Sequence, residues 1–174
     1  FAKILREEHQ STDFSINFTI YDNEDSLKLI RRIIKDKNLD KETYIAKQIF
    51  SKISILKNNM IKPEQYRTNS ELMQLDKINK REHFVTIYKL YNQECLNANA
   101  MDFDDILVYT HNLFINNKDT LEIYQDIFKY ILIDEYQDTN KIQDAIVRLL
   151  AKKTQNICVV GDDSQSIYSF RGAN

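Results

Sequence analysis

The strings ILIDEYQDTN, from Ile131 to Asn140, and ICVVGDDSQSIYSFRGAN, from Ile157 to Asn174, share one pattern. Each begins as a short apolar run and ends abruptly in acidic and polar residues. Such a run is typical of a buried strand that carries polar side chains to the edge of a sheet. In open α/β folds chemistry usually takes place at that edge, so these two strings are the first candidates for a functional site.

The segment between the two strings has helical periodicity. Its apolar positions are Ile142, Ala145, Ile146, Leu149 and Leu150. We therefore predict a strand over 129–134, a helix, and a second strand over 156–161. A crossover of this length makes the two strands parallel and the connection right-handed, which is a βαβ unit.

The chain from residue 1 to about 125 reads as a series of amphipathic helices. We expect one helix capped by Asp25 or Ser26, one from Ile45 to Leu56, one that begins near Lys62 with Pro63 in its first turn, a long one from about Asn69 to Leu96, and one capped by Asp102. One proline and two glycines in 174 residues favour long helices over a turn-rich β fold. The prediction is a mostly helical α/β fold, with a boundary near residues 116–126.

Composition places the chain among globular proteins, because 43% of its residues are hydrophobic and 29% are charged. The formal net charge of −2 gives no overall basic signature, so binding to nucleic acid would have to depend on a local patch or on stacking. No membrane span or leader segment is visible, which predicts a cytoplasmic protein without membrane partners. Since the chain begins with Phe1, we expect it to be a segment of something longer.

The cysteines and histidines do not suggest a metal site. Cys95 and Cys158 lie far apart and form no C-x-x-C pair, so we interpret both as small hydrophobic residues. His9, His83 and His111 are scattered without the spacing of metal ligands.

The acids that follow the first strand suit phosphate chemistry. Asp134, at a strand end, can hold Mg²⁺ directly or through water. Glu135 projects differently and is the candidate base for a water that attacks a terminal phosphate. Gln165 offers a neutral amide that could sense that phosphate.

A phosphate-binding loop of the G-x-x-x-x-G-K type is missing from the sequence. Such a loop needs closely spaced glycines, because only a backbone without Cβ turns its N–H groups onto the phosphates. The chain has only Gly161 and Gly172. We therefore expect half of an active site, with the metal and water end present and the phosphate cradle absent.

The strings DEYQDTN and VVGDDSQSIYSFRGAN resemble the Walker B motif and motif III of the UvrD, Rep and PcrA family of superfamily-one DNA helicases. The segment MDFDDI, from Met101 to Ile106, is similar to the family's L-D-F-D-D-L segment. This resemblance implies a helical insertion domain over residues 1–125. It also implies a partial RecA-like (P-loop NTPase) core over residues 126–174.

The resemblance also implies roles for individual residues at a nucleotide site. Glu135 and Gln165 would be catalytic, and Asp134 would bind the metal. ATP would be contacted by Asp134, Glu135, Gln137 and Gln165, with the two glutamines coupling the nucleotide state to DNA binding.

DNA binding is implied for the aromatic end of the second string. Tyr168 and Phe170 would stack on bases of single-stranded DNA, and Arg171 would help to hold the strand. Stacking of this kind contributes about 1 to 3 kcal/mol per base. The family usually has tryptophan where Phe170 stands and a D-Q pair where Ser164 and Gln165 stand, so the stacking surface is smaller and one charge is missing.

The resulting prediction is a fragment of an ATP-dependent DNA helicase with 3′-to-5′ polarity, acting in DNA repair or replication. Its cofactors would be ATP and Mg²⁺, and its partners single-stranded and duplex DNA. We expect the isolated chain to be inactive, because nothing in it presents a nucleotide to Asp134 and Glu135. We also expect an open edge at the strand that ends at Gly161, which leads to self-association or local disorder there.

Two alternatives remain at this point. A metal-dependent nuclease could use a two-metal site built from Asp134, Glu135, Asp138, Asp162 and Asp163. A non-catalytic docking module could instead bind a protein or DNA through the helical part, where lysines between Lys41 and Lys62 outnumber acids.

Overall fold

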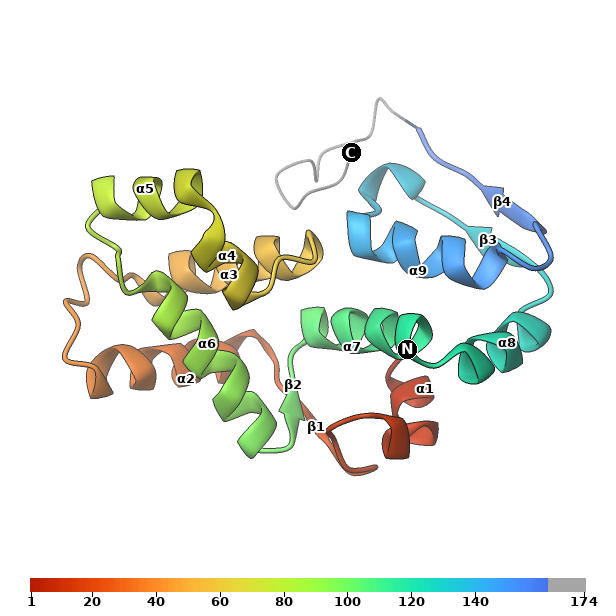
Figure 1. Cartoon of the computed structure of the whole chain (residues 1–174), viewed down its shortest axis with the longest axis horizontal. Helices are drawn as coiled ribbons and strands as arrows, with labels where there is room; N and C mark the ends of the chain where they lie inside the picture. Colours follow the sequence, from red (N-terminus) through yellow and green to blue (C-terminus); the bar gives the residue numbers. More distant parts are fainter. Residues whose placement is uncertain (163–174) are drawn as a thin grey trace. The chain divides into compact units, whose positions relative to one another are not determined.

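The computed structural model describes residues 1–162, which are mostly helical (Figure 1). The chain divides into two compact units. Unit 1 comprises residues 1–16, 58–60 and 105 onward, and unit 2 comprises residues 17–57 and 61–104. Unit 2 is therefore inserted within the sequence of unit 1.

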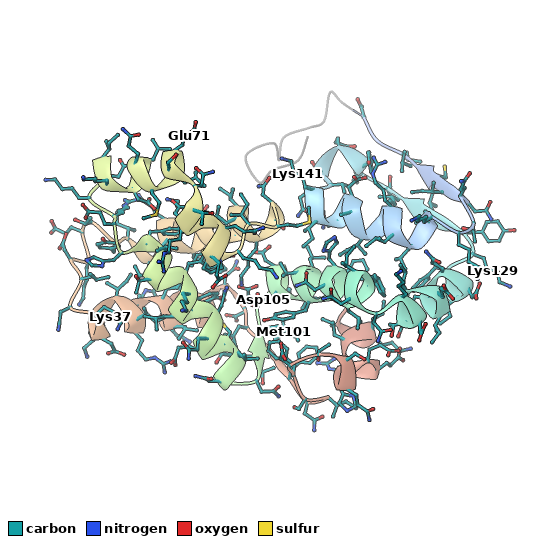
Figure 2. The ribbon with its side chains drawn as sticks, in the orientation of Figure 1. Lys37, Glu71, Met101, Asp105, Lys129 and Lys141 are labelled. Carbon is teal, nitrogen blue, oxygen red and sulfur yellow. The ribbon has the colours of Figure 1, made fainter. Side chains whose placement is uncertain are left out.

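Unit 2 contains most of the helices that the sequence predicted. Its elements are β1 (Thr19–Ile20), α2 (Asn23–Asp36), α3 (Ala46–Asn58), α4 (Pro63–Thr68), α5 (Ser70–Ile78), α6 (Phe84–Asn97) and β2 (Ala100–Met101). β1 and β2 pair in parallel, with Thr19 opposite Ala100. Met101 of β2, labelled in Figure 2, lies opposite Ile20 in this pair and is completely buried. The first and last segments of the unit therefore lie side by side.

Large aromatic side chains fill the core of unit 2. Tyr66, Phe84 and Tyr91 are fully buried among the aliphatic residues of α2, α3 and α6. A buried tyrosine hydroxyl needs a polar partner, and both tyrosines have an acid. Tyr66 donates to Asp76 Oδ2 at 2.5 Å, and Tyr91 donates to Asp102 Oδ2 at 2.8 Å. Burial, followed by these acids, raises the pKa of both hydroxyls.

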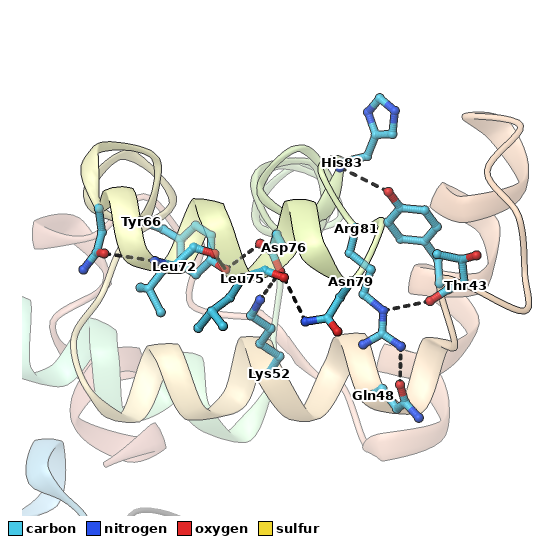
Figure 3. A network of polar contacts seen from close by, with 12 residues as sticks. Thr43, Gln48, Lys52, Tyr66, Leu72, Leu75, Asp76, Asn79, Arg81 and His83 are labelled. Atoms are coloured by element: carbon cyan, nitrogen blue, oxygen red, sulfur yellow. Dashed lines mark hydrogen bonds and ion pairs between the residues drawn. The ribbon is translucent and has the colours of Figure 1, made fainter.

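Two lysines of α3 form ion pairs with these acids. Lys57 Nζ lies 2.7 Å from Asp102 Oδ2, with side-chain exposures of only 3% and 2%. Lys52 binds Asp76, as Figure 3 shows. Of the lysines proposed as a docking face between Lys41 and Lys62, these two are therefore held by internal acids. These two lysines are less available to contact a phosphate, which weakens the docking alternative.

Unit 1 holds the predicted βαβ arrangement. Its elements are α1 (Ala2–Glu7), a short 3₁₀ helix η1 (His9–Ser11), α7 (Phe103–Asn116), α8 (Lys118–Ile127), β3 (Ile131–Ile133), η2 (Tyr136–Asp138), α9 (Lys141–Ala151) and β4 (Ile157–Val159), with the first two residues of α7 belonging to unit 2. β3 and β4 are parallel neighbours joined through α9 (Figure 1). The prediction of a mostly helical α/β fold is confirmed, whereas a RecA-like core stays a prediction.

The prediction of one long helix from Asn69 to Leu96 is wrong. α5 ends at Ile78 and α6 begins at Phe84. Lys80, between them, has φ of 56°, which is a left-handed conformation that ends a helix. Arg81 then donates from Nε to Thr43 O at 2.9 Å and from Nη2 to Gln48 Oε1 at 2.5 Å (Figure 3). These tertiary hydrogen bonds favour the turn over a continuous helix.

The helix starts were predicted in part. α4 begins at Pro63 and α7 begins directly after Asp102, as expected. The N-cap of α2 is Asp22, three residues before the expected Asp25, and it accepts a hydrogen bond from Asp25 N at 2.8 Å. The boundaries of the compact units also differ from the predicted boundary near residues 116–126, since α7 and α8 belong mainly to unit 1. The assignment of residues 1–125 to an insertion domain stays a prediction.

The strands of unit 1 are more exposed than their sequences suggest. Leu132 is 73% exposed, and Val159 is 48% exposed. Cys95 is buried as expected, but Cys158 is exposed, so its interpretation as a buried hydrophobic residue is wrong. Within residues 1–162, no helix combines the length and the apolar character that crossing a membrane requires.

Candidate functional site

The parallel pairing of β3 and β4 brings the ends of the two strings together. Ile133 lies opposite Val159 in the register. Beyond the strands, Val160 N donates to Ile133 O at 2.8 Å, and Tyr136 N donates to Val160 O at 2.9 Å. The acids after β3 and the turn after β4 therefore lie at one edge of the sheet, as the sequence predicted.

The chain turns sharply between Asp134 and Glu135. Glu135 has φ of 53° and ψ of 42°, a left-handed conformation that costs a residue with a side chain roughly 1–2 kcal/mol. Asp134 Oδ1 accepts a hydrogen bond from Glu135 N at 3.0 Å, which stabilises the turn. Both acidic residues are exposed. A strained residue at a strand end is a frequent property of functional sites.

Gln137 connects the two strand ends through its side-chain amide. Its Nε2 donates to Glu135 Oε2 at 2.6 Å, and its Oε1 accepts from Asp162 N at 3.0 Å. Gln137 is only 8% exposed, although its two partners, Glu135 and Asp162, are exposed. The position of the Glu135 carboxylate is therefore linked to the backbone that follows β4.

Gly161 is required by this arrangement. A Cβ atom at this position would lie 2.7 Å from Gln137 Oε1 and 3.3 Å from Gln137 N. A distance under 3 Å is a steric clash, so a larger residue would displace the amide. Gly161 thus permits the close approach of the two chain segments rather than a special backbone angle.

Sequence reasoning missed a second polar network beside the site. Tyr136 donates from its hydroxyl to Asp144 Oδ1 at 2.7 Å, and Arg148 Nε lies 2.6 Å from Asp144 Oδ2. The hydrogen bond to Asp144 is the main reason why the pKa of Tyr136 is raised. The spacing of Asp144 and Arg148, four residues apart on α9, was the available sequence signal. The network fixes η2 against α9.

The described acids do not gather into a metal cluster. Within residues 1–162, no group of three or more His, Cys, Asp or Glu side chains could hold a metal ion. This arrangement gives no support to the two-metal nuclease alternative. Of the five acids proposed for that site, only Asp163 lies outside the described residues. Mg²⁺ that carries a nucleotide keeps several waters and needs only one or two carboxylates. The exposed Asp134 fits that simpler requirement.

Several predicted site residues lie outside the described residues. These are Gln165, Tyr168, Phe170 and Arg171. The structure therefore brings together Asp134, Glu135 and Gln137 of the predicted set.

Comparison with known proteins identifies the family. The sequence model of the UvrD/REP helicase N-terminal domain matches residues 2–174. A probable DNA helicase II homolog of Rickettsia conorii is 40% identical over 174 residues, covering 99% of this chain and 26% of that protein. The ATP-dependent DNA helicase PcrA of Staphylococcus epidermidis is 40% identical over 173 residues, covering 99% and 23%. The chain spans about a quarter of the length of these relatives, and it belongs to the UvrD/REP helicase N-terminal domain family.

Proposed function

We propose that this chain is part of an ATP-dependent DNA helicase and carries the residues that act on the water and the metal during ATP hydrolysis. The observation that carries the proposal is the hydrogen-bonded series from Glu135 through Gln137 to Asp162. It joins a candidate base to the chain segment that leads toward the proposed DNA-binding residues. The names of the relatives support the same activity.

Each residue of the series has a separate task in this proposal. Asp134 is the residue that would hold Mg²⁺, which supplies charge neutralisation at the phosphates when bound. Glu135 accepts the proton of the attacking water, a task that suits its exposed carboxylate. Gln137 holds that carboxylate by donating to Oε2. A change in the backbone at Asp162 would therefore alter the position of the Glu135 carboxylate through Gln137.

DNA binding in the proposal depends on the residues after Asp162. Tyr168 and Phe170 stack on bases of single-stranded DNA, Arg171 holds the strand, and Gln165 responds to the nucleotide. The intact protein moves with 3′-to-5′ polarity on single strands, unwinds duplex DNA, and serves repair or replication. The exposed apolar side chains of β3 and β4 support a further part of the proposal, which is that strands from elsewhere in the intact protein extend this sheet into a RecA-like core.

The decisive experiment is ATP hydrolysis by the full-length protein that contains this chain, with and without single-stranded DNA. Glu135→Gln removes the base, and we expect it to lower kcat about 10²- to 10⁴-fold. Glu122→Gln, at an exposed glutamate of α8, is the matched control and should leave kcat unchanged. A wild-type protein without DNA-stimulated hydrolysis, or an active Glu135→Gln variant, would contradict the proposal.

Two experiments on the chain itself test its proposed incompleteness. We expect no magnesium-dependent ATP turnover, because the chain lacks closely spaced glycines for a phosphate loop. We also expect self-association through the exposed strands, which sedimentation would detect. A monodisperse monomer that hydrolyses ATP would refute both expectations.

Fluorescence anisotropy with labelled single-stranded DNA tests the proposed stacking residues. The double variant Tyr168→Ala, Phe170→Ala should bind more weakly by about 1 to 3 kcal/mol per lost stack. Tyr130→Ala is a suitable control, since Tyr130 is 83% exposed but has no proposed role. Equal loss in the control would show that stacking at Tyr168 and Phe170 is not specific.

A further inference from the structure

Two asparagines that are far apart in sequence meet inside unit 1. Asn140 Nδ2 donates to Asn58 Oδ1 at 2.8 Å, across a separation of 82 residues. Asn140 ends the string DEYQDTN and is the N-cap residue of α9. Asn58 is the last residue of α3 and is only 7% exposed. It belongs to the short segment 58–60 that is the only part of 17–104 assigned to unit 1.

Helix capping alone does not explain the amide of Asn140. Its Oδ1 accepts from Gln143 N at 3.0 Å, and its backbone N donates to Gln143 Oε1 at 3.0 Å, which completes a capping box. Serine or aspartate would cap the helix equally well. Only the bond to Asn58 uses the side-chain N–H group. That bond is therefore a second, separate task of Asn140.

The two ends of this bond are both held in place. On one side, α3 is anchored one residue earlier, because Lys57 forms the buried ion pair with Asp102. On the other side, a tight turn leads from Asn140 back to Glu135. In that turn Asp138 N donates to Glu135 O at 2.9 Å, and Thr139 N donates to Tyr136 O at 3.0 Å.

We propose that Asn58 is a positioning residue for ATP hydrolysis. By accepting the hydrogen bond from Asn140, it fixes the segment 136–140 and thereby the direction in which Glu135 presents its carboxylate. The proposal rests on the function proposed above. It assigns to the end of α3, a helix outside the motif strings, an influence on the base that acts through Asn140.

The test measures kcat and KM for ATP in the full-length protein with saturating single-stranded DNA. Asn58→Ala removes the acceptor, and we expect kcat to fall about ten-fold or more with KM changed less than about two-fold, because a small misplacement of a catalytic group affects the chemical step. Asn58→Asp keeps an acceptor for Asn140 Nδ2, so its kcat should stay well above that of Asn58→Ala, although the buried charge lowers its stability. Rescue by aspartate separates positioning from a general loss of packing.

A matched pair of cap variants provides the second arm. Asn140→Ser keeps the N-cap acceptor but loses the amide donor, so it should lower kcat as Asn58→Ala does. Asn117 is also an N-cap, with Oδ1 accepting from Thr120 N at 3.1 Å and Nδ2 donating to Ser11 Oγ at 3.3 Å. Asn117→Ser makes the same chemical change on α8 and should leave kcat unchanged. The comparison of Asn140→Ser with Asn117→Ser also tests the proposal if Asn58→Ala fails to fold.

The outcomes separate the inference from the proposed function. Wild-type kcat in both Asn58→Ala and Asn140→Ser, with Glu135→Gln inactive, would overturn the inference alone. Equal losses in Asn140→Ser and Asn117→Ser would also overturn it, since capping would then explain the effect. A wild-type protein that does not hydrolyse ATP with DNA would overturn both.

Discussion

Unit 2 buries charged side chains that form ion pairs, whereas the β3–β4 sheet of unit 1 exposes apolar side chains. In unit 2, Lys57 and Asp102 are almost inaccessible to water, and Asp76 is 3% exposed. In unit 1, Leu132 is 73% exposed and Val160 is 53% exposed. Burying a charge is costly unless it is paired, and exposing apolar strands is costly unless something covers them.

The difference indicates that the two units are complete to different degrees. The buried acids of unit 2 have their partners within the unit, and its two terminal strands pair with each other. Unit 1 presents apolar strands together with the exposed acids Asp134 and Glu135. A surface of this kind is expected where further strands and a substrate bind. The stability of unit 2 should therefore depend on its own residues, and that of unit 1 on what it binds.

The largest effect is expected from breaking the buried ion pair of unit 2. Asp102→Ala removes the carboxylate that binds both Lys57 and Tyr91. We expect the free energy of unfolding of the chain to fall by about 3–5 kcal/mol, the usual result of removing one member of a buried pair. Urea denaturation measures the change.

The control for Asp102→Ala is a pair on the surface of unit 1. Lys153 Nζ and Asp126 Oδ1 are 2.5 Å apart, but their side chains are 48% and 64% exposed. Asp126→Ala should cost less than about 1 kcal/mol. Equal costs at the two sites would break the contrast between buried and exposed charge.

A smaller effect is expected at Asp76 on α5. Asp76→Ala removes the partner of Lys52 and of the Tyr66 hydroxyl (Figure 3). Lys52 is 31% exposed, so its ammonium group can turn toward water once the acid is gone. We expect a loss of about 1–3 kcal/mol in urea denaturation. A loss as large as that of Asp102→Ala would show that Lys52 is held more tightly than its exposure suggests.

In unit 1, Gly161→Ala tests the close approach at the candidate site. The new Cβ would displace the Gln137 amide and weaken its bond to Asp162 N. The expected cost is about 1 kcal/mol. A double-mutant cycle with Gln137→Ala should show that the two changes are not additive, because each removes the same interaction. Strict additivity would contradict the proposed steric link between these residues.

The strands, α9 and the shared edge could be predicted because the signals are local. Apolar runs of strand length and a helical period between them fix a parallel pair, and this pairing places Asp134, Glu135 and Asp162 at one edge. The start of α4 at Pro63 followed from the fixed φ angle of proline.

What could not be predicted depends on partners far away in sequence. Lys57 and Asp102 are 45 residues apart in sequence. From the sequence alone, a lysine in an amphipathic helix is expected to face water. The break before α6 carries no glycine or proline, since it is Lys80 that takes the left-handed conformation. The strands β1 and β2 have two residues each, which is too short for a period. Asn58 gave no signal, because its partner Asn140 is identified only in the folded chain.

The smallest effect is expected from Cys158→Ser. Cys158 is exposed on β4, so the substitution should change the stability of this chain by less than about 0.5 kcal/mol. Cys95→Ser, at a buried site on α6, would place a hydroxyl in the core of unit 2 and should cost about 1–3 kcal/mol. If strands from the intact protein cover β4, Cys158 should react quickly with a thiol reagent in the chain, diluted until it is monomeric, and slowly in the full-length protein. Equal reaction rates in both would mean that this strand stays uncovered, and the proposed extension of the sheet on that side would then be wrong.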